Sequence, residues 1–120
     1  MEFLKVFDGE CTDGSEIRMY EGNGDNDGSV EERVSRCSAA CRAKKKPLTG
    51  SWDDFVANGF IITPSNGRCY CESSDAFTCE RKSNEYDRYV WKTIGVRKVP
   101  LIQNSPNNIL LRSSLCESER

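Results

Sequence analysis

The sequence predicts an α+β fold in which one helix is disulfide-stapled to a small antiparallel β-sheet. Three observations carry this prediction. Cys37 and Cys41 stand four residues apart in a helical segment, so both side chains leave the same face of it. Cys69 and Cys71 stand two residues apart in a strand segment and likewise share a face. Finally, five of the seven cysteines fall within residues 37–79, as expected where bridges supplement a thin hydrophobic core.

The N-terminal part of the chain is predicted to hold a strand, a loop and the helix. Residues 3–7 alternate weakly between apolar and polar side chains, which is typical of an edge strand. The stretch 11–28 is rich in Gly, Asn and Asp and is predicted to be a loop. The helix begins at Val30, because Ser29 and Glu32 form a capping box, and it ends before the next proline. Its buried stripe is predicted to consist of Val30, Val34, Cys37 and Cys41.

A β-hairpin is predicted after the helix. A β-branched run at residues 60–63 and an alternating run at 68–72 flank a Pro-Ser-Asn-Gly reversal. In the second strand Cys69 and Cys71 face one way, while Tyr70 faces the other. The hairpin therefore presents two thiols to the helix.

An alternating stretch with aromatic side chains at residues 88–96 predicts a third strand. Beyond it the pattern fades into proline, asparagine and serine, which favours a loosely ordered tail. We therefore expect one domain over residues 1–98, within the usual size of a single compact unit, followed by a C-terminal tail over 99–120.

The cysteine spacing favours a nested pairing, in which Cys41 bonds to Cys69 and Cys37 bonds to Cys71. Four cysteines allow three connectivities, and a bond between Cys71 and Cys79 also stays open.

A bridge between Cys11 and Cys116 is expected to join the two ends of the chain. That pairing leaves Cys79 as the odd thiol, either free or linked to another chain, so we expect a monomer or a disulfide-linked oligomer.

Composition excludes several classes of function. The chain has no histidine, which removes histidine-based nucleophile activation and general-base catalysis, so we expect no enzyme and no cofactor. A net charge of -2 does not indicate the basic surface that binds nucleic acid, and no apolar run is long enough to span a membrane. One metal-binding alternative remains: Cys37-x3-Cys41 has acceptable zinc spacing, which would suit an intracellular protein holding zinc through four cysteines.

Aromatic side chains beside an arginine supply the candidate binding residues. Such groupings recur at binding surfaces, where a rigid ring and a planar cation contribute most of the contact energy. The candidate ligand-binding residues are Tyr70, Arg88 and Tyr89. Tyr70 is favoured because its strand neighbours point the other way.

The order of a Cys-x3-Cys helix, then Gly59-Phe60-Ile61-Ile62, then Gly67-Arg68-Cys69-Tyr70-Cys71 resembles the PAN/Apple domain family. The resemblance covers residues 30–72 and extends loosely toward Trp91, and the sequence also resembles cysteine-rich secreted modules of algae and other protists. It implies a helix bonded to an antiparallel sheet by helix-to-strand disulfides, in an extracellular protein that binds other proteins or carbohydrates. Only the framework cysteines carry over from that family.

These observations together predict a secreted or extracellular, non-catalytic module that binds a glycan or an extracellular protein. The chain shows no signal peptide, so export is inferred from its cysteines. An alternative from another class is a structural component of a wall, matrix or particle, crosslinked through the odd cysteine.

Overall fold

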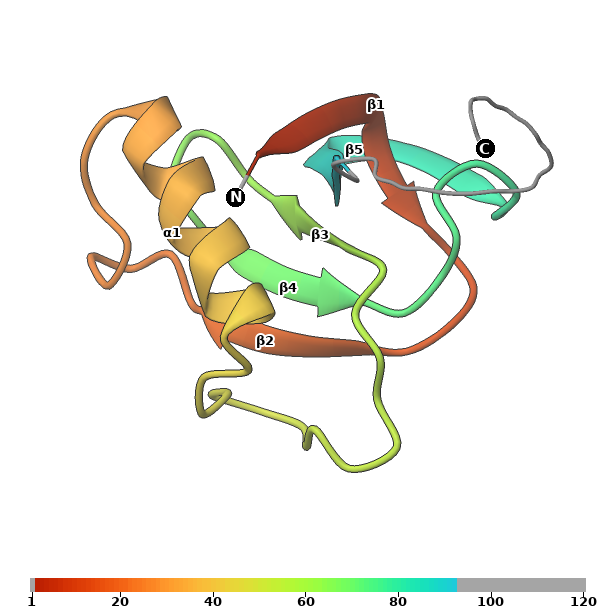
Figure 1. The fold of residues 1–120 in the computed structure, drawn as a ribbon. Coiled ribbons are helices and arrows are strands. Elements are labelled where there is room, and N and C mark those ends of the chain that lie inside the picture. Colours follow the sequence, from red (N-terminus) through yellow and green to blue (C-terminus); the bar gives the residue numbers. More distant parts are fainter. Residues whose placement is uncertain (1, 93–120) are drawn as a thin grey trace, which may run out of the picture.

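The computed structural model describes residues 2–92 and contains one helix and a five-stranded sheet (Figure 1). The elements in chain order are β1 (Phe3–Cys11), β2 (Glu16–Tyr20), α1 (Val30–Arg42), β3 (Gly59–Ile62), β4 (Cys69–Glu72) and β5 (Arg81–Trp91). All strand pairs are antiparallel, in the order β1-β5-β3-β4-β2. The predicted α+β fold is therefore confirmed.

Helix α1 begins where the capping box predicts. The Ser29 side chain accepts the backbone N–H of Glu32, and the Glu32 carboxylate accepts the backbone N–H of Ser29. The helix ends at Arg42, and Ala43 caps it. The buried stripe differs from the prediction at its first position, because Val30 is 48% exposed. The buried side chains of α1 are Val34, Cys37, Ser38, Ala40 and Cys41.

The predicted edge strand is confirmed and extends to Cys11, whereas the loop predicted over residues 11–28 contains a strand that the sequence analysis missed. In β2, Ile17 and Met19 are buried against the helix side of the sheet. Its outer edge is covered by the segment after α1, because Leu48 donates its N–H to the carbonyl of Arg18 at 2.8 Å. Two apolar residues gave too short an alternating pattern for a strand to be predicted.

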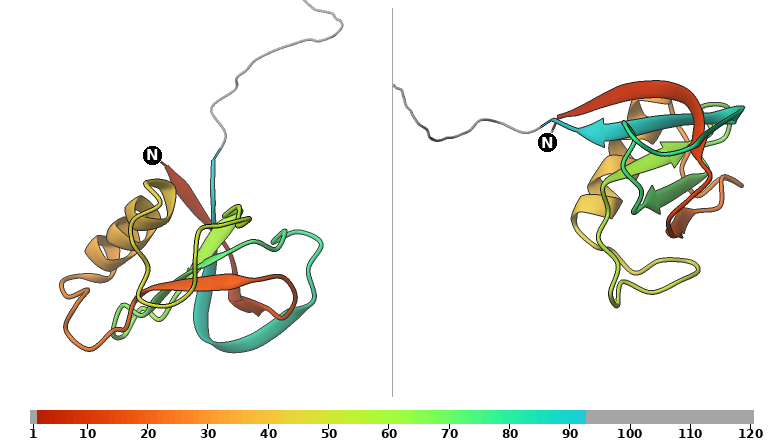
Figure 2. Two further views of the ribbon diagram at one scale, coloured as in Figure 1. Left: turned by 90° about the horizontal axis from the view of Figure 1, so that it is seen from below. Right: turned by 90° about the vertical axis from the view of Figure 1, so that its right-hand side faces the viewer.

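The predicted hairpin is confirmed as β3 and β4, with Ile61 opposite Tyr70 in the ladder. The predicted third strand is β5, which begins at Arg81 and pairs with both β3 and β1. The β1–β5 register shifts twice, after Lys5 and after Asp8. Figure 2 shows the two long strands running side by side while α1 lies against one face of the sheet. Residues 93–98, the predicted tail 99–120 and Cys116 lie outside the described residues.

Two disulfides join α1 to β4, as the fold prediction required, but their pairing is not the nested one. Cys37 bonds to Cys69 and Cys41 bonds to Cys71, each with 5.7 Å between Cα atoms. The helix therefore advances in the same direction as β4. One helical turn and two strand residues both advance about 6 Å, so two parallel bridges fit without distortion.

The third disulfide joins Cys11 to Cys79. The predicted bridge between Cys11 and Cys116 is therefore wrong, and Cys79 is not the odd thiol. The bond ties the end of β1 to the loop before β5, a separation of 68 residues. In the part of the chain that the structure describes, no helix is long and apolar enough to cross a membrane.

Candidate functional site

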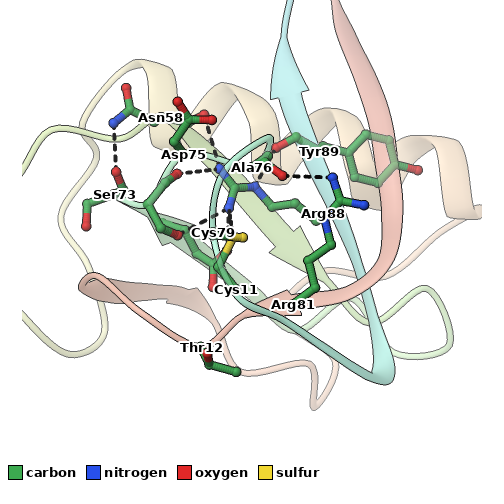
Figure 3. Close-up of polar contacts among 12 residues, drawn as sticks. Cys11, Thr12, Asn58, Ser73, Asp75, Ala76, Cys79, Arg81, Arg88 and Tyr89 are labelled. Atoms are coloured by element: carbon green, nitrogen blue, oxygen red, sulfur yellow. Dashed lines mark hydrogen bonds and ion pairs between the residues drawn. A yellow bond between two sulfur atoms is a disulfide. The ribbon is translucent and has the colours of Figure 1, made fainter.

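The predicted site residue Arg88 is fully buried, with 0% of its surface exposed. It lies opposite Ile61 on the face of the sheet away from α1. Its guanidinium donates to Glu72 Oε1 at 2.8 Å and to the carbonyl of Ser74 at 2.9 Å. It also donates to Cys11 Sγ at 3.0 Å (Figure 3). The side chain thus links β4, β1 and the loop 73–80. Because it is buried, its N–H groups are not accessible to a ligand at the surface.

Glu72 shares this buried site and is 2% exposed. Its pKa is raised to about 8, chiefly by burial and further by neighbouring Glu16, while Arg88 lowers it. Burial also raises the pKa of Glu16. Carboxylate oxygens of Glu10, Glu16 and Glu72 lie within 4.8 Å of one another. Asn84 donates to Glu10 and Arg88 donates to Glu72, so two of these three carboxyl groups have donors within the protein.

The structure does not bring the three predicted ligand-binding residues into one surface. Tyr70 lies on the same sheet face as Arg88 but is separated from it by Ile61. Its ring packs edge-on against Tyr86, with centroids 6.0 Å apart. Tyr89 points to the helix face, where its ring stacks on Phe60 at 5.1 Å.

Tyr89 also lines a small groove between β5 and the first turns of α1. Its volume is 370 Å³, and its walls are Phe3, Val30, Glu31, Val34, Ser35 and Tyr89. Of the three predicted residues, Tyr70 and Tyr89 are partly exposed, each on a different face. The alternation of side chains along a strand separates Arg88 from Tyr89, although the two are adjacent in sequence.

A larger open groove of 630 Å³ lies on the face of the sheet away from α1. Its lining includes Leu4 and Val90, which are direct cross-strand partners, together with Phe77 from the loop 73–80. The remaining lining residues are Asn58, Asp75, Ala76, Trp91 and Lys92. Leu4 is 48% exposed and Phe77 is 67% exposed, so the groove offers apolar surface to solvent.

Phe77 is exposed but firmly positioned. Its backbone N–H donates to the Asp75 side chain at 2.8 Å, and Cys79 donates to the Asp75 carbonyl at 2.9 Å. Ala76 is 2% exposed, and its carbonyl accepts from Arg81 at 3.0 Å. The disulfide to Cys11 anchors the end of the turn. The sequence signal for this site is an isolated phenylalanine in a polar stretch beside a cysteine.

The cysteines do not form the zinc site kept as an alternative. The sulfurs of Cys37, Cys41 and Cys69 lie within 4.8 Å of one another. However, these three sulfurs and that of Cys71 are bonded in pairs, so they cannot serve together as thiolate ligands.

The PAN/Apple-like resemblance and the binding role stay predictions, since no family model, no curated protein and no solved structure matches this chain.

Proposed function

We propose that this domain is an extracellular, non-catalytic module that recognises a protein partner through the groove of Leu4, Phe77 and Val90. The observation that carries the proposal is Phe77, a large apolar side chain that is 67% exposed on a turn fixed by hydrogen bonds and a disulfide. A rigid exposed aromatic loses little conformational entropy on binding, which is why such rings dominate contact energies.

The lining of the groove favours an apolar protein side chain over a glycan. Five of its eight lining residues are apolar, and its polar side chains have partners within the protein. Asn58 donates to the carbonyl of Ser73 at 2.7 Å, and Lys92 pairs with Glu2 at 3.5 Å. A sugar needs several uncommitted hydrogen-bond partners, whereas an apolar side chain needs only matching surface.

Three disulfides within residues 2–92 support an oxidising compartment. Pairing of six cysteines in a chain of this size is characteristic of secreted domains that are stabilised by bridges as well as by a core. This is the basis for proposing an extracellular location.

The proposal is tested by screening the oxidised protein against a display library of extracellular protein domains and, in parallel, against a glycan array. Phe77→Ala should weaken a selected interaction by about 2 kcal/mol, or about 30-fold in Kd. Leu48→Ala is the matched control, because Leu48 is 54% exposed and lies beside β2, at the opposite edge of the sheet. Binding that is equally strong in both variants would place the site elsewhere. A glycan whose binding depends on Phe77 would keep the groove and change the partner class.

A further inference from the structure

The three disulfides lie in different environments. The two helix-to-strand bridges are sealed, since all four of their cysteines are at most 2% exposed. In the third bridge Cys11 is 4% exposed, while Cys79 is partly exposed in the loop 73–80. A dissolved thiol can therefore reach one end of the Cys11–Cys79 bond more readily than either of the other bonds.

The two sulfurs of this bridge also differ electrostatically. Arg88 Nη1 donates to Cys11 Sγ at 3.0 Å, and the guanidinium is fully buried (Figure 3). A disulfide sulfur is a weak acceptor, whereas a thiolate is a strong one, so this contact strengthens when negative charge develops on Cys11. A cation held against a cysteine sulfur in a low-dielectric site favours the thiolate.

We propose that the Cys11–Cys79 bridge is a thiol-exchange site, at which an external thiol attacks Cys79 and Arg88 holds Cys11 as the leaving thiolate. The attacking thiolate forms a new S–S bond to Cys79 Sγ. The Cys11–Cys79 bond breaks, and its electron pair leaves on Cys11 Sγ, beside the guanidinium. With a monothiol the product is a mixed disulfide on Cys79. With a dithiol, the second thiolate attacks that mixed disulfide, so the dithiol is oxidised by two electrons and both cysteines are reduced.

Two neighbouring acidic side chains oppose the reaction. Glu72 Oε1 accepts from the same Arg88 Nη1 at 2.8 Å, so it competes with Cys11 Sγ for this donor. The Asp13 carboxylate lies within 4.8 Å of both sulfurs and is exposed, so it repels an approaching thiolate. The site thus carries a cation at the leaving sulfur and an anion at its entrance. Removing the cation should slow thiol exchange and removing the anion should accelerate it, so the two effects can be measured separately.

The primary experiment uses the full oxidised chain. The native protein is incubated with glutathione, free thiols are trapped with an alkylating reagent, and the products are mapped by peptide mass spectrometry. We expect glutathione on Cys79, an alkylated Cys11, and the two helix-to-strand bridges intact. Glutathione on Cys11, or equal opening of all three bridges, would overturn the proposal. This outcome requires no variant.

Variants then test the charges. Arg88→Met should slow adduct formation by about tenfold, because the leaving thiolate loses its stabilising cation. Asp13→Asn should accelerate it, with no effect on the fold expected at an exposed position. Lys5→Met is the control for net charge, because Lys5 pairs with Asp8 and Asp87 rather than with the bridge. Rates that are unchanged in both Arg88→Met and Asp13→Asn would overturn the electrostatic mechanism. If Arg88→Met does not fold, the site of glutathione attachment and the Asp13→Asn rate still decide it.

Discussion

The buried Arg88 guanidinium donates to the Glu72 carboxyl group, with 2.8 Å between Nη1 and Oε1, on the face of the sheet that α1 does not cover. Neither residue has appreciable solvent exposure. Because a buried cation needs several acceptors, the same guanidinium also binds carbonyls from the chain segments around it. These hydrogen bonds therefore hold the chain segments on this face of the sheet together, whereas apolar side chains do so on the helix face.

Removing the arginine should be strongly destabilising. Arg88→Met leaves the carbonyls of Asn58 and Ser74 and the carboxyl group of Glu72 without this donor. We expect a loss of about 3 kcal/mol or more in the free energy of unfolding, measured by urea denaturation of the oxidised protein. The control Arg42→Met removes an exposed arginine that packs over Trp91, and it should cost about 1 kcal/mol or less. Equal losses of unfolding free energy in the two variants would show that Arg88 stabilises the fold no more than an exposed arginine does.

Stability should fall as the pH rises from about 5 to above 8. The pKa of Glu72 is raised to about 8 in the folded protein and returns to its ordinary value on unfolding. Between those values the folded state holds the proton and the unfolded state does not, so stability is full at the acidic end and is lost through pH 8. The raised pKa of Glu16 acts in the same direction. The chain has no histidine to obscure the effect.

Denaturation midpoints at pH 5, 7 and 9 measure this dependence. Glu72→Gln mimics the protonated carboxyl and should flatten the profile above pH 5. The lowered pKa values of Asp8 and Glu32 act only at more acidic pH, where they reduce stability as those carboxylates protonate. A wild-type profile that rises between pH 5 and 8 would contradict the assignment.

The pairing of the helix and strand cysteines can be tested by counting thiols. Under denaturing but non-reducing conditions the six cysteines within residues 2–92 should all resist alkylation in the wild type, because they are bonded in pairs. Cys41→Ala/Cys71→Ala removes a whole bridge, so the number of alkylatable thiols should equal that of the wild type. Cys37→Ala/Cys71→Ala takes one cysteine from each bridge, so it should expose two further thiols. The opposite pattern would restore the nested pairing.

Loss of the helix cap should have a smaller effect. Ser29→Ala removes the acceptor for the Glu32 backbone N–H and should reduce stability by about 1 kcal/mol, measured by the denaturation midpoint. Ser35→Ala is the matched control, because Ser35 is exposed in the middle of the same helix and alanine is the better helix former there. We expect that control to be neutral or slightly stabilising.

What the sequence predicted well was local. Ser29 and Glu32 located the helix start because a capping box involves only neighbouring residues. The spacing of Cys69 and Cys71 indicated a shared strand face for the same reason. The bridge pairing was not predictable in this way, because it depends on the relative direction of α1 and β4. That direction is set by the 26 residues between Arg42 and Cys69, in which β3 is the one regular element.

The candidate site was harder to predict, because burial of charge depends on partners distant in sequence. Arginine is ordinarily exposed, and nothing adjacent to Arg88 indicates that β3 brings it beside Glu72. The exposed aromatic that lines the large groove is Phe77, which the sequence analysis passed over in favour of Tyr70 and Tyr89. Its position follows from the turn that holds it, which is fixed by hydrogen bonds to Asp75 and by the bridge to Cys11.

The edge strands of the sheet, β1 and β2, affect how two copies of the domain can associate. The hydrogen bonds of Arg18 with Leu48 and Thr49 occupy part of the outer edge of β2, and two register shifts interrupt β1 on the other side. Charged Lys5 and Asp8 flank the first of these irregularities. Neither edge therefore offers a long, regular template on which a strand from another molecule can pair. Two copies of the domain that meet edge to edge should therefore resist joining into one continuous intermolecular sheet.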